Sequence, residues 1–264
     1  MTSAGESAQR SRSKLVLDVL GTATPYPLPD RPCSGYLLSF EDVRLWIDVG
    51  PGTFAEVQRH VGLDSLSALW VSHAHDDHFG DLPALYYAFA FGEVRRGTRL
   101  PVMGPPGWTT RVSDFVAGDQ VHDMASVFEV TEHRDGDRRL FGELELLTRA
   151  VRHNVPAFGL RVSAGGHSLA YSGDSAPCDE LVELARGATV FLCEVGISSR
   201  HSEAWIAHCT PEDAGSMASR ANAELLLLTH FGPGVDAMEA AKRAGRVFEG
   251  PVRTAAPGLR VDVA

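Results

Sequence analysis

Apolar and polar positions alternate along the first half of the chain in a way that predicts short strands joined by polar loops. β-Rich runs indicate a strand over Leu15–Leu20 and a hairpin formed by Gly35–Phe40 and Val43–Asp48. A third, buried strand is expected over Leu66–Ser72. A helix is expected over Leu82–Phe91, where the early proline is tolerated in a first turn.

The second half of the chain continues the alternation of strands and helices. Strands are predicted over Leu144–Arg152, Leu160–Ser163, Ser168–Tyr171, Thr189–Glu194 and Leu225–Thr229. Helices are predicted over Cys178–Arg186, Thr210–Ala221 and Val235–Phe248, with Thr210 as an N-cap. Two batches of strands and helices predict an α/β fold in which sheets pack between helices. The chemistry is then expected in the loops beyond the strand ends.

Length and composition favour one domain. The chain has 264 residues, of which 44% are apolar and 22% charged, and it has no internal repeat or linker. We therefore expect one domain over residues 14–264, after a disordered tail at 1–13 that lacks the apolar middle of a signal peptide. No run reaches the roughly 18 apolar residues of a membrane helix.

Charge and cysteine content indicate the setting. A net charge of −10 disfavours a protein that grips long nucleic acids and favours a small-molecule substrate. The cysteines show no CxxC spacing and are expected to be reduced thiols, which predicts a cytoplasmic location. The sequence leaves the oligomeric state open and is compatible with a homodimer. The cysteines are Cys33, Cys178, Cys193 and Cys209.

The segment with the clearest chemistry is the run from Ser72 to His78, SHAHDDH. Histidines one residue apart at a strand end project to the same side, and a carboxylate and a third imidazole follow within three residues. Nitrogen and oxygen donors in this density suit a borderline divalent ion such as Zn²⁺. A polar helix entrance would explain the two aspartates but not three histidines directly after a buried strand.

This run resembles the HxHxDH signature of the metallo-β-lactamase superfamily. Further segments resemble the other motifs of that superfamily in the same order, namely WIDVG before the signature, VRH at 151–153, YSGD at 171–174 and LTH at 228–230. The resemblance implies a four-layer αββα sandwich and a metal-dependent hydrolase.

By the same resemblance, the site holds two divalent metal ions, zinc by default, with manganese or iron as alternatives. One ion would be bound by His73, His75 and His153, and the other by Asp77, His78 and His230. Asp174 would bridge the two ions, which leaves room for water and substrate.

Three further segments resemble the phosphodiesterase branch that includes ribonuclease Z and class II-type cyclic nucleotide phosphodiesterases. They are LGTA at 20–23, FLCE at 191–194 and HCT at 208–210, in which Cys209 departs from the usual serine. This resemblance implies that Glu194 keeps His208 protonated and that His208 protonates the leaving alkoxide. Asp77 joins them as a catalytic carboxylate. The alternative is that His208 only precedes a helix cap and Glu194 ends a strand at the surface.

The substrate is less well defined than the metals. A small phosphodiester such as a 3′,5′-cyclic nucleotide is favoured. A lactonase or thioesterase with the same metals is the alternative, because its oxyanion would use the same ions. Cleavage of tRNA 3′ ends is disfavoured, because the ribonuclease Z enzymes that carry a tRNA-gripping arm insert it between the segments that His153 and Asp174 resemble, and here only a plain hairpin joins these two residues.

The remaining polar and aromatic candidates receive weaker assignments. Asp48 is equally compatible with a turn and with support of the ligand loop, and Asp76 is assigned no metal. His201 is compatible with a rim position. We expect a buried helix face for Tyr86, Tyr87, Phe89 and Phe91. Solvent-facing positions are expected for His60, His122, His133 and His167.

Overall fold

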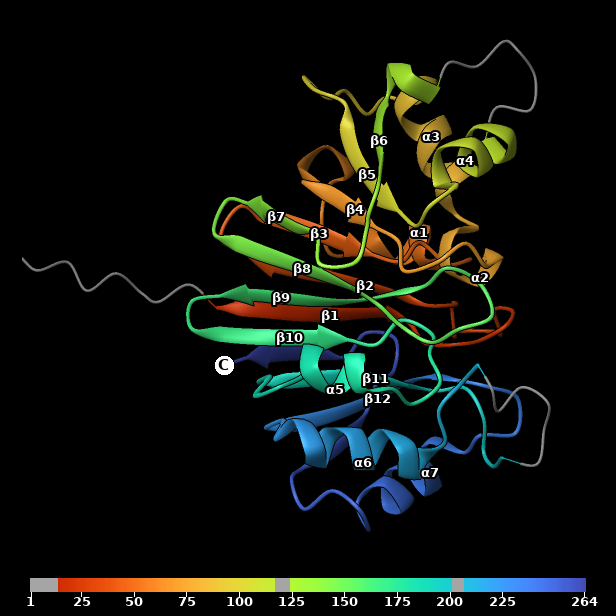
Figure 1. Cartoon of the computed structure of the whole chain (residues 1–264). Helices are drawn as coiled ribbons and strands as arrows, with labels where there is room; N and C mark the ends of the chain where they lie inside the picture. The colour runs from red at the N-terminus through yellow and green to blue at the C-terminus, as the bar shows by residue number, and fades with distance from the viewer. Residues whose placement is uncertain (1–13, 117–123, 201–206) are drawn as a thin grey trace, which may run out of the picture.

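The computed structural model describes residues 14–116, 124–200 and 207–264. Two mixed sheets of seven strands each lie face to face, with helices on the outer side of both (Figure 1). The first sheet has the order β14-β1-β2-β3-β4-β5-β6. Its strands are β1 (Leu15–Gly21), β2 (Gly35–Phe40), β3 (Val43–Ile47), β4 (Ala68–Trp70), β5 (Leu100–Gly104), β6 (Phe128–Glu132) and β14 (Arg260–Val263).

The second sheet has the order β13-β12-β11-β10-β9-β8-β7. Strands β10 to β13 run parallel, whereas β7 to β10 form an antiparallel meander. The strands are β7 (Arg138–Phe141), β8 (Leu144–Ala150), β9 (Phe158–Ala164), β10 (His167–Tyr171), β11 (Val190–Val195), β12 (Leu225–Phe231) and β13 (Val252–Thr254).

The helices form the two outer layers. Helices α3 and α4 lie against the first sheet, and α5 to α7 lie against the second (Figure 1). Their bounds are α1 (Thr53–Val57), α2 (Asp76–Phe79), α3 (Leu82–Ala90), α4 (Trp108–Val116), α5 (Asp179–Leu184), α6 (Pro211–Ala221) and α7 (Ala237–Ala244). No helix in the described ranges has the length and apolar character needed to cross a membrane.

Three apolar cores follow from the period of two along the strands. On β2, Tyr36 and Leu38 point into the core between the sheets, while Leu37 points into the core under α3 and α4. On β11, Leu192 faces the core between the sheets and Phe191 faces the core under α5 and α6. A strand buried on both faces needs apolar residues at every position, which explains the unbroken apolar runs.

The predicted four-layer architecture is confirmed, and the sequence also located the early strands and the helix cap of α6 correctly. Thr210 accepts a hydrogen bond from the backbone of Asp213, and the Asp213 side chain accepts one from the backbone of Thr210, which forms a capping box. The single-domain organisation stays a prediction. The sequence missed α1, α2, α4, β5, β6, β7, β13 and β14.

The expectation of a solvent-facing His133 is wrong. His133 follows β6 and is buried, its ring stacked on Trp70 with centroids 5.0 Å apart. Its Nε2 lies 3.0 Å from the carbonyl oxygen of Val71. A neutral imidazole can donate this hydrogen bond and also pack as an aromatic ring, which is why a histidine is compatible with this buried position.

Of the other weakly assigned residues, some lie as expected and some do not. His60 is exposed and His167 is partly exposed, whereas His122 and His201 lie outside the described residues. On α3 and just after it, Tyr86 and Phe89 are buried as expected. Tyr87 and Phe91 are exposed, against expectation, because a helix of this length covers the sheet with one face only.

Candidate metal centre

Four histidine and aspartate side chains from strand-end loops, two from helix α2 and a seventh from β12 meet at one edge of the two sheets. His73 follows β4 and is itself buried. His75 is the N-cap of α2, which carries Asp77 and His78 in its single turn. His153 follows β8, Asp174 follows β10 and His230 lies near the end of β12.

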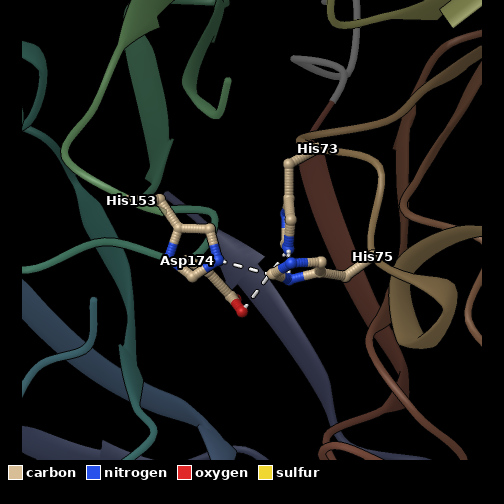
Figure 2. Close-up of side chains that lie close together, drawn as sticks. All are labelled: His73, His75, His153 and Asp174. Carbon is tan, nitrogen blue, oxygen red and sulfur yellow. Dashed lines mark hydrogen bonds and ion pairs between the residues drawn. The ribbon is translucent and has the colours of Figure 1, made fainter. Parts of the chain in front are cut away.

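Three imidazoles and one carboxylate form a first group that could hold a metal ion, and their side chains point toward one another (Figure 2). Nδ1 of His75 lies 3.0 Å from Nε2 of His73 and 3.3 Å from Nε2 of His153. Oδ2 of Asp174 lies 3.6 Å from Nε2 of His73.

Asp77, His78 and His230 form a second such group. The Nε2 atoms of His78 and His230 lie 3.2 Å apart. Oδ1 of Asp174 lies 3.3 Å from Nε2 of His78 and 3.2 Å from Nε2 of His230. The two oxygens of Asp174 therefore face different groups, as a carboxylate shared between two ions would.

These donor sets fit divalent ions. Ligands about 2.0–2.1 Å from a tetrahedral zinc ion lie about 3.3 Å from one another, close to the spacings in both groups. Oδ1 of Asp174 is buried, and no residue in the described ranges donates a hydrogen bond to it. A buried carboxylate oxygen without a donor needs a positive charge nearby, and an ion between His78, His230 and Asp174 would supply it.

His230 reaches the centre because β12 is irregular at this residue. Glu194 of β11 pairs with Thr229, and the next residue, Val195, pairs with Phe231, so the register skips His230. His230 has a φ of 53°, in the left-handed region that few residues other than glycine adopt. Such a bulge turns a side chain away from the regular strand direction, here toward the cluster.

Burial and charge set the protonation of the cluster. Burial lowers the pKa of His73, His75 and His153, which favours the neutral imidazole that binds metals. Burial alone would raise the pKa of Asp174. However, the nearby imidazoles of His230, His78 and His73 hold it well below its ordinary value, so it stays a carboxylate.

Hydrogen bonds from outside the cluster select the nitrogen that His78 and His153 present. Nδ1 of His78 lies 2.7 Å from Oδ2 of Asp48, and Nδ1 of His153 lies 2.9 Å from the carbonyl oxygen of Ala207. Each contact leaves Nε2 free to face the cluster. Asp48 therefore contacts the ligand loop and is more than a turn residue, although its φ of 54° also places it in the left-handed region.

His208 and Glu194 lie beside the cluster and contact each other. Nδ1 of His208 is 2.9 Å from Oε1 of Glu194, which also accepts a hydrogen bond from the backbone N–H of Ser175 at 3.0 Å. Glu194 is fully buried, which contradicts the alternative of a surface carboxylate. Burial lowers the pKa of His208, but the hydrogen bond and charge of Glu194, together with Asp174, raise it to about 9.

Gly196 permits this close contact. A Cβ atom at that position would lie 2.7 Å from Nδ1 of His208 and 3.0 Å from Oε2 of Glu194. The backbone N–H of Gly196 also donates to Oε2 of Glu194 at 2.6 Å. Any larger residue would push the imidazole away from the carboxylate.

Comparison with known proteins decides the family. Residues 43–231 match the family described as the beta-lactamase superfamily domain. The chain belongs to this superfamily. The match covers the segment from β3 to the end of β12, and so includes all seven residues of the cluster.

Relatives of this superfamily member share most of its length. It is 35% identical to an uncharacterized protein of Mycobacterium leprae over 94% of this chain and 88% of that protein. It is 30% identical to human zinc phosphodiesterase ELAC protein 2 over 80% of this chain and 29% of that protein. The fold resembles the metallo-β-lactamase fold protein YhfI of Bacillus subtilis, with a TM-score of 0.83, 23% identity and coverage of 94% and 99% of the two chains.

These findings confirm a metal-dependent hydrolase of the metallo-β-lactamase fold. The sequence predicted the members of the cluster but missed residues that contact it. The hydroxyl of Thr24 donates to Oδ2 of Asp77 at 2.7 Å, and the hydroxyl of Ser72 lies 3.0 Å from Nδ1 of His73. Thr24 follows the LGTA segment and Ser72 is the first residue of the SHAHDDH run, and these positions were the only signal available for them.

Proposed function

We propose that this hydrolase is a phosphodiesterase that acts on small phosphodiesters, with 3′,5′-cyclic nucleotides as the leading substrate class. The proposed cofactors are two divalent ions per chain, zinc by default, with manganese or iron as alternatives. The chemistry that such ions supply is polarisation of a phosphoryl oxygen and a lowered pKa of the attacking water.

The proposed ligand assignment follows the two donor groups. His73, His75 and His153 would hold one ion, and Asp77, His78 and His230 the other, with Asp174 shared between them. The separate orientation of the two Asp174 oxygens supports this sharing. We also propose that Asp77 acts as a catalytic carboxylate, because it lies in the second group and carries a negative charge at the reacting centre. Burial would raise the pKa of Asp77, but His78 and His230 hold it far below the ordinary value.

The observation that carries the proposal is the His208–Glu194 pair. A ribose oxygen is a poor leaving group and needs a proton as its bond to phosphorus breaks. In the proposed mechanism, Glu194 holds Nδ1 of His208 and stabilises the imidazolium, and Nε2 of His208 donates the proton to the departing oxygen. The contact of 2.9 Å between Nδ1 and Oε1 supports these roles, since it orients the imidazole and leaves Nε2 free.

A second role for His208 must be weighed against this one. Asp174, His208 and His230 also lie close enough together to share an ion. However, the His208 nitrogen near Asp174 is Nδ1, at 4.0 Å from Oδ2, and that nitrogen already bonds to Glu194. The nearest nitrogens of His73, His78 and His230 lie closer to Asp174, at 3.2–3.6 Å, so we favour the proton donor for His208.

Processing of tRNA is not the proposed activity, although a relative is named a zinc phosphodiesterase and the family resemblance includes ribonuclease Z. The segment between His153 and Asp174 consists of β9 and β10, which pair directly with register His167↔Ala164. This short hairpin offers no extended arm, and the net charge of −10 disfavours a long polyanion. A reducing, cytoplasmic setting is proposed from the four free thiols, and a homodimer remains a prediction.

A substrate panel tests the proposal. Metal-loaded enzyme would be assayed on bis-p-nitrophenyl phosphate, cyclic AMP, cyclic GMP, a simple lactone, an acyl thioester and a 3′-extended tRNA precursor. We expect hydrolysis of the aryl phosphodiester and of at least one cyclic nucleotide. Faster turnover of the lactone or thioester would establish the alternative hydrolase class. Clean cleavage of the tRNA precursor at a comparable rate would establish the endonuclease.

A further inference from the structure

The carboxylate of Asp48 is fully buried beneath the cluster and accepts four hydrogen bonds. Oδ1 accepts one from the backbone N–H of Ser72 at 2.7 Å. Oδ2 accepts three, from the hydroxyl of Ser72 at 2.9 Å, from Nδ1 of His78 at 2.7 Å and from the hydroxyl of Tyr171 at 2.7 Å. A buried charge with this many donors has a fixed position.

Asp48 is connected to both donor groups. His78 belongs to the second group and contacts Asp48 directly. His73 belongs to the first group, and its Nδ1 lies 3.0 Å from the Ser72 hydroxyl, which in turn donates to Asp48. A displacement of the Asp48 carboxylate would therefore turn an imidazole in each group.

Tyr171 comes from a different sheet than the other donors to Asp48. Asp48, Ser72 and His78 all follow strands of the first sheet, whereas Tyr171 is the last residue of β10 in the second sheet. Three residues after Tyr171 the chain reaches Asp174, which faces both groups. Burial, and then the charge of Asp48, raise the pKa of Tyr171 well above its ordinary value, so the hydroxyl stays protonated and donates.

We propose that Tyr171 is a positioning residue that fixes the two halves of the metal centre relative to each other through Asp48. Its hydroxyl ties the carboxylate that orients His78 to the strand that delivers Asp174. This inference rests on the proposed ligand assignment. Without the hydroxyl, Asp48 keeps its donors from the first sheet but loses its bond to the second. The spacing between His78 and Asp174 is then less constrained.

Tyr36 provides a matched control within the same core. It is as fully buried as Tyr171, and the two ring centroids lie 5.1 Å apart. Its hydroxyl pairs with that of Thr229 at 2.7 Å and also joins the two sheets, but it has no bond to Asp48. Tyr171→Phe and Tyr36→Phe each remove one buried hydroxyl, and only the first removes a donor to Asp48.

The experiment measures zinc affinity by chelator competition for wild type, Tyr171→Phe and Tyr36→Phe, with absorption spectra of the cobalt-substituted proteins as a second readout. Groups that orient metal ligands typically contribute 10–100-fold to affinity. We expect Tyr171→Phe to weaken the more loosely held ion by about that factor and to change the cobalt spectrum. Tyr36→Phe should stay within about twofold of wild type, because among the described residues its partner hydroxyl on Thr229 makes no hydrogen bond to a proposed ligand.

Equal affinity losses in the two variants, or no loss in Tyr171→Phe, would overturn the inference. If Tyr171→Phe does not fold, Ser72→Ala removes the other hydroxyl on Oδ2 of Asp48 together with its contact to Nδ1 of His73, so a loss of zinc affinity at least as large as that expected for Tyr171→Phe is required. An unchanged zinc affinity in that variant would count equally against a positioning role for the hydroxyls on Asp48. Wild-type protein that binds only one ion would instead refute the proposed dinuclear centre, so the two failures are distinguishable.

Discussion

Nδ1 of His208 lies 2.9 Å from Oε1 of Glu194, and this contact joins a partly exposed imidazole to a carboxylate with no solvent exposure. Glu194 is held in turn by the backbone N–H groups of Ser175 and Gly196. The carboxylate therefore cannot turn away from the histidine without losing two further hydrogen bonds. A carboxylate fixed in this way favours the charged form of the imidazole, as a general acid requires.

His208→Ala should lower kcat for a cyclic nucleotide by about 10²–10⁴-fold, because general acid catalysis typically contributes that much. The loss for bis-p-nitrophenyl phosphate should be much smaller, since p-nitrophenolate leaves without a proton. Steady-state kinetics on both substrates, with metal content determined for each protein, measure the difference. An equal loss on the two substrates would make His208 a positional residue, and loss of an ion would make it a ligand.

Glu194→Gln should shift the pH dependence of cyclic-nucleotide hydrolysis to lower pH. His208 acts in its protonated form, so kcat/KM falls as pH rises through its pKa. Burial lowers this pKa, but the hydrogen bond and charge of Glu194, together with Asp174, raise it to about 9, and a neutral amide at position 194 removes the Glu194 charge. Bound cations lower the value in both proteins, so the displacement between them is the observable. A falling limb at the same pH in both would show that another group titrates.

The candidate site could be predicted from the sequence because its residues lie close to motifs at strand ends. His73, Asp77 and His78 share one short segment, and a buried apolar run before it shows that a strand delivers them. The contacts of Asp48 could not be predicted in the same way. Its partner Tyr171 is 123 residues away, and only the packing of the two sheets brings the hydroxyl to the carboxylate.

The strands that the sequence missed also depend on contacts between distant parts of the chain. Leu100–Gly104 contains a proline and a methionine in five residues, so its local β preference is weak, and its pairing with β4 and β6 decides its conformation. β14 pairs with β1 from the opposite end of the chain, which no local pattern reveals. The burial of His133 could not be predicted either, because its polar ring is stacked on Trp70 and this contact depends on tertiary packing.

Substitution of a ligand that belongs to one group only should release one ion and leave the other bound. Wild-type protein is expected to bind close to two divalent ions per chain, and His230→Ala close to one, because Nε2 of His230 faces the second group and Asp174. Elemental analysis after dialysis against a weak chelator measures both. Activity that survives exhaustive chelation, or a second ion retained by His230→Ala, would contradict the assignment.

The buried His133 should lower the free energy of unfolding as the pH falls, and the substitution His133→Phe should remove this contribution. Burial lowers its pKa in the folded protein to about 4, from an ordinary value of 6.5. The unfolded chain therefore takes up a proton as pH falls through 6.5, whereas the folded protein does so only near 4. Stability contributed by this group is present above pH 6.5 and is lost as pH falls toward 4, by up to about 3 kcal/mol.

His133→Phe keeps an aromatic ring against Trp70 but cannot titrate. It should be about 1 kcal/mol less stable than wild type at pH 7.5, because the carbonyl oxygen of Val71 loses its donor. Between pH 6.5 and 4 that deficit should shrink or reverse, since only wild type pays the cost of excluding the proton. Urea unfolding of both proteins in excess chelator gives the difference at each pH, and the metal ligands, common to both, cancel. A stability deficit of His133→Phe that stays constant from pH 7.5 to 4 would mean that His133 takes up its proton at the same pH in the folded and the unfolded protein. Its contact with the ring of Trp70 and its burial oppose this outcome.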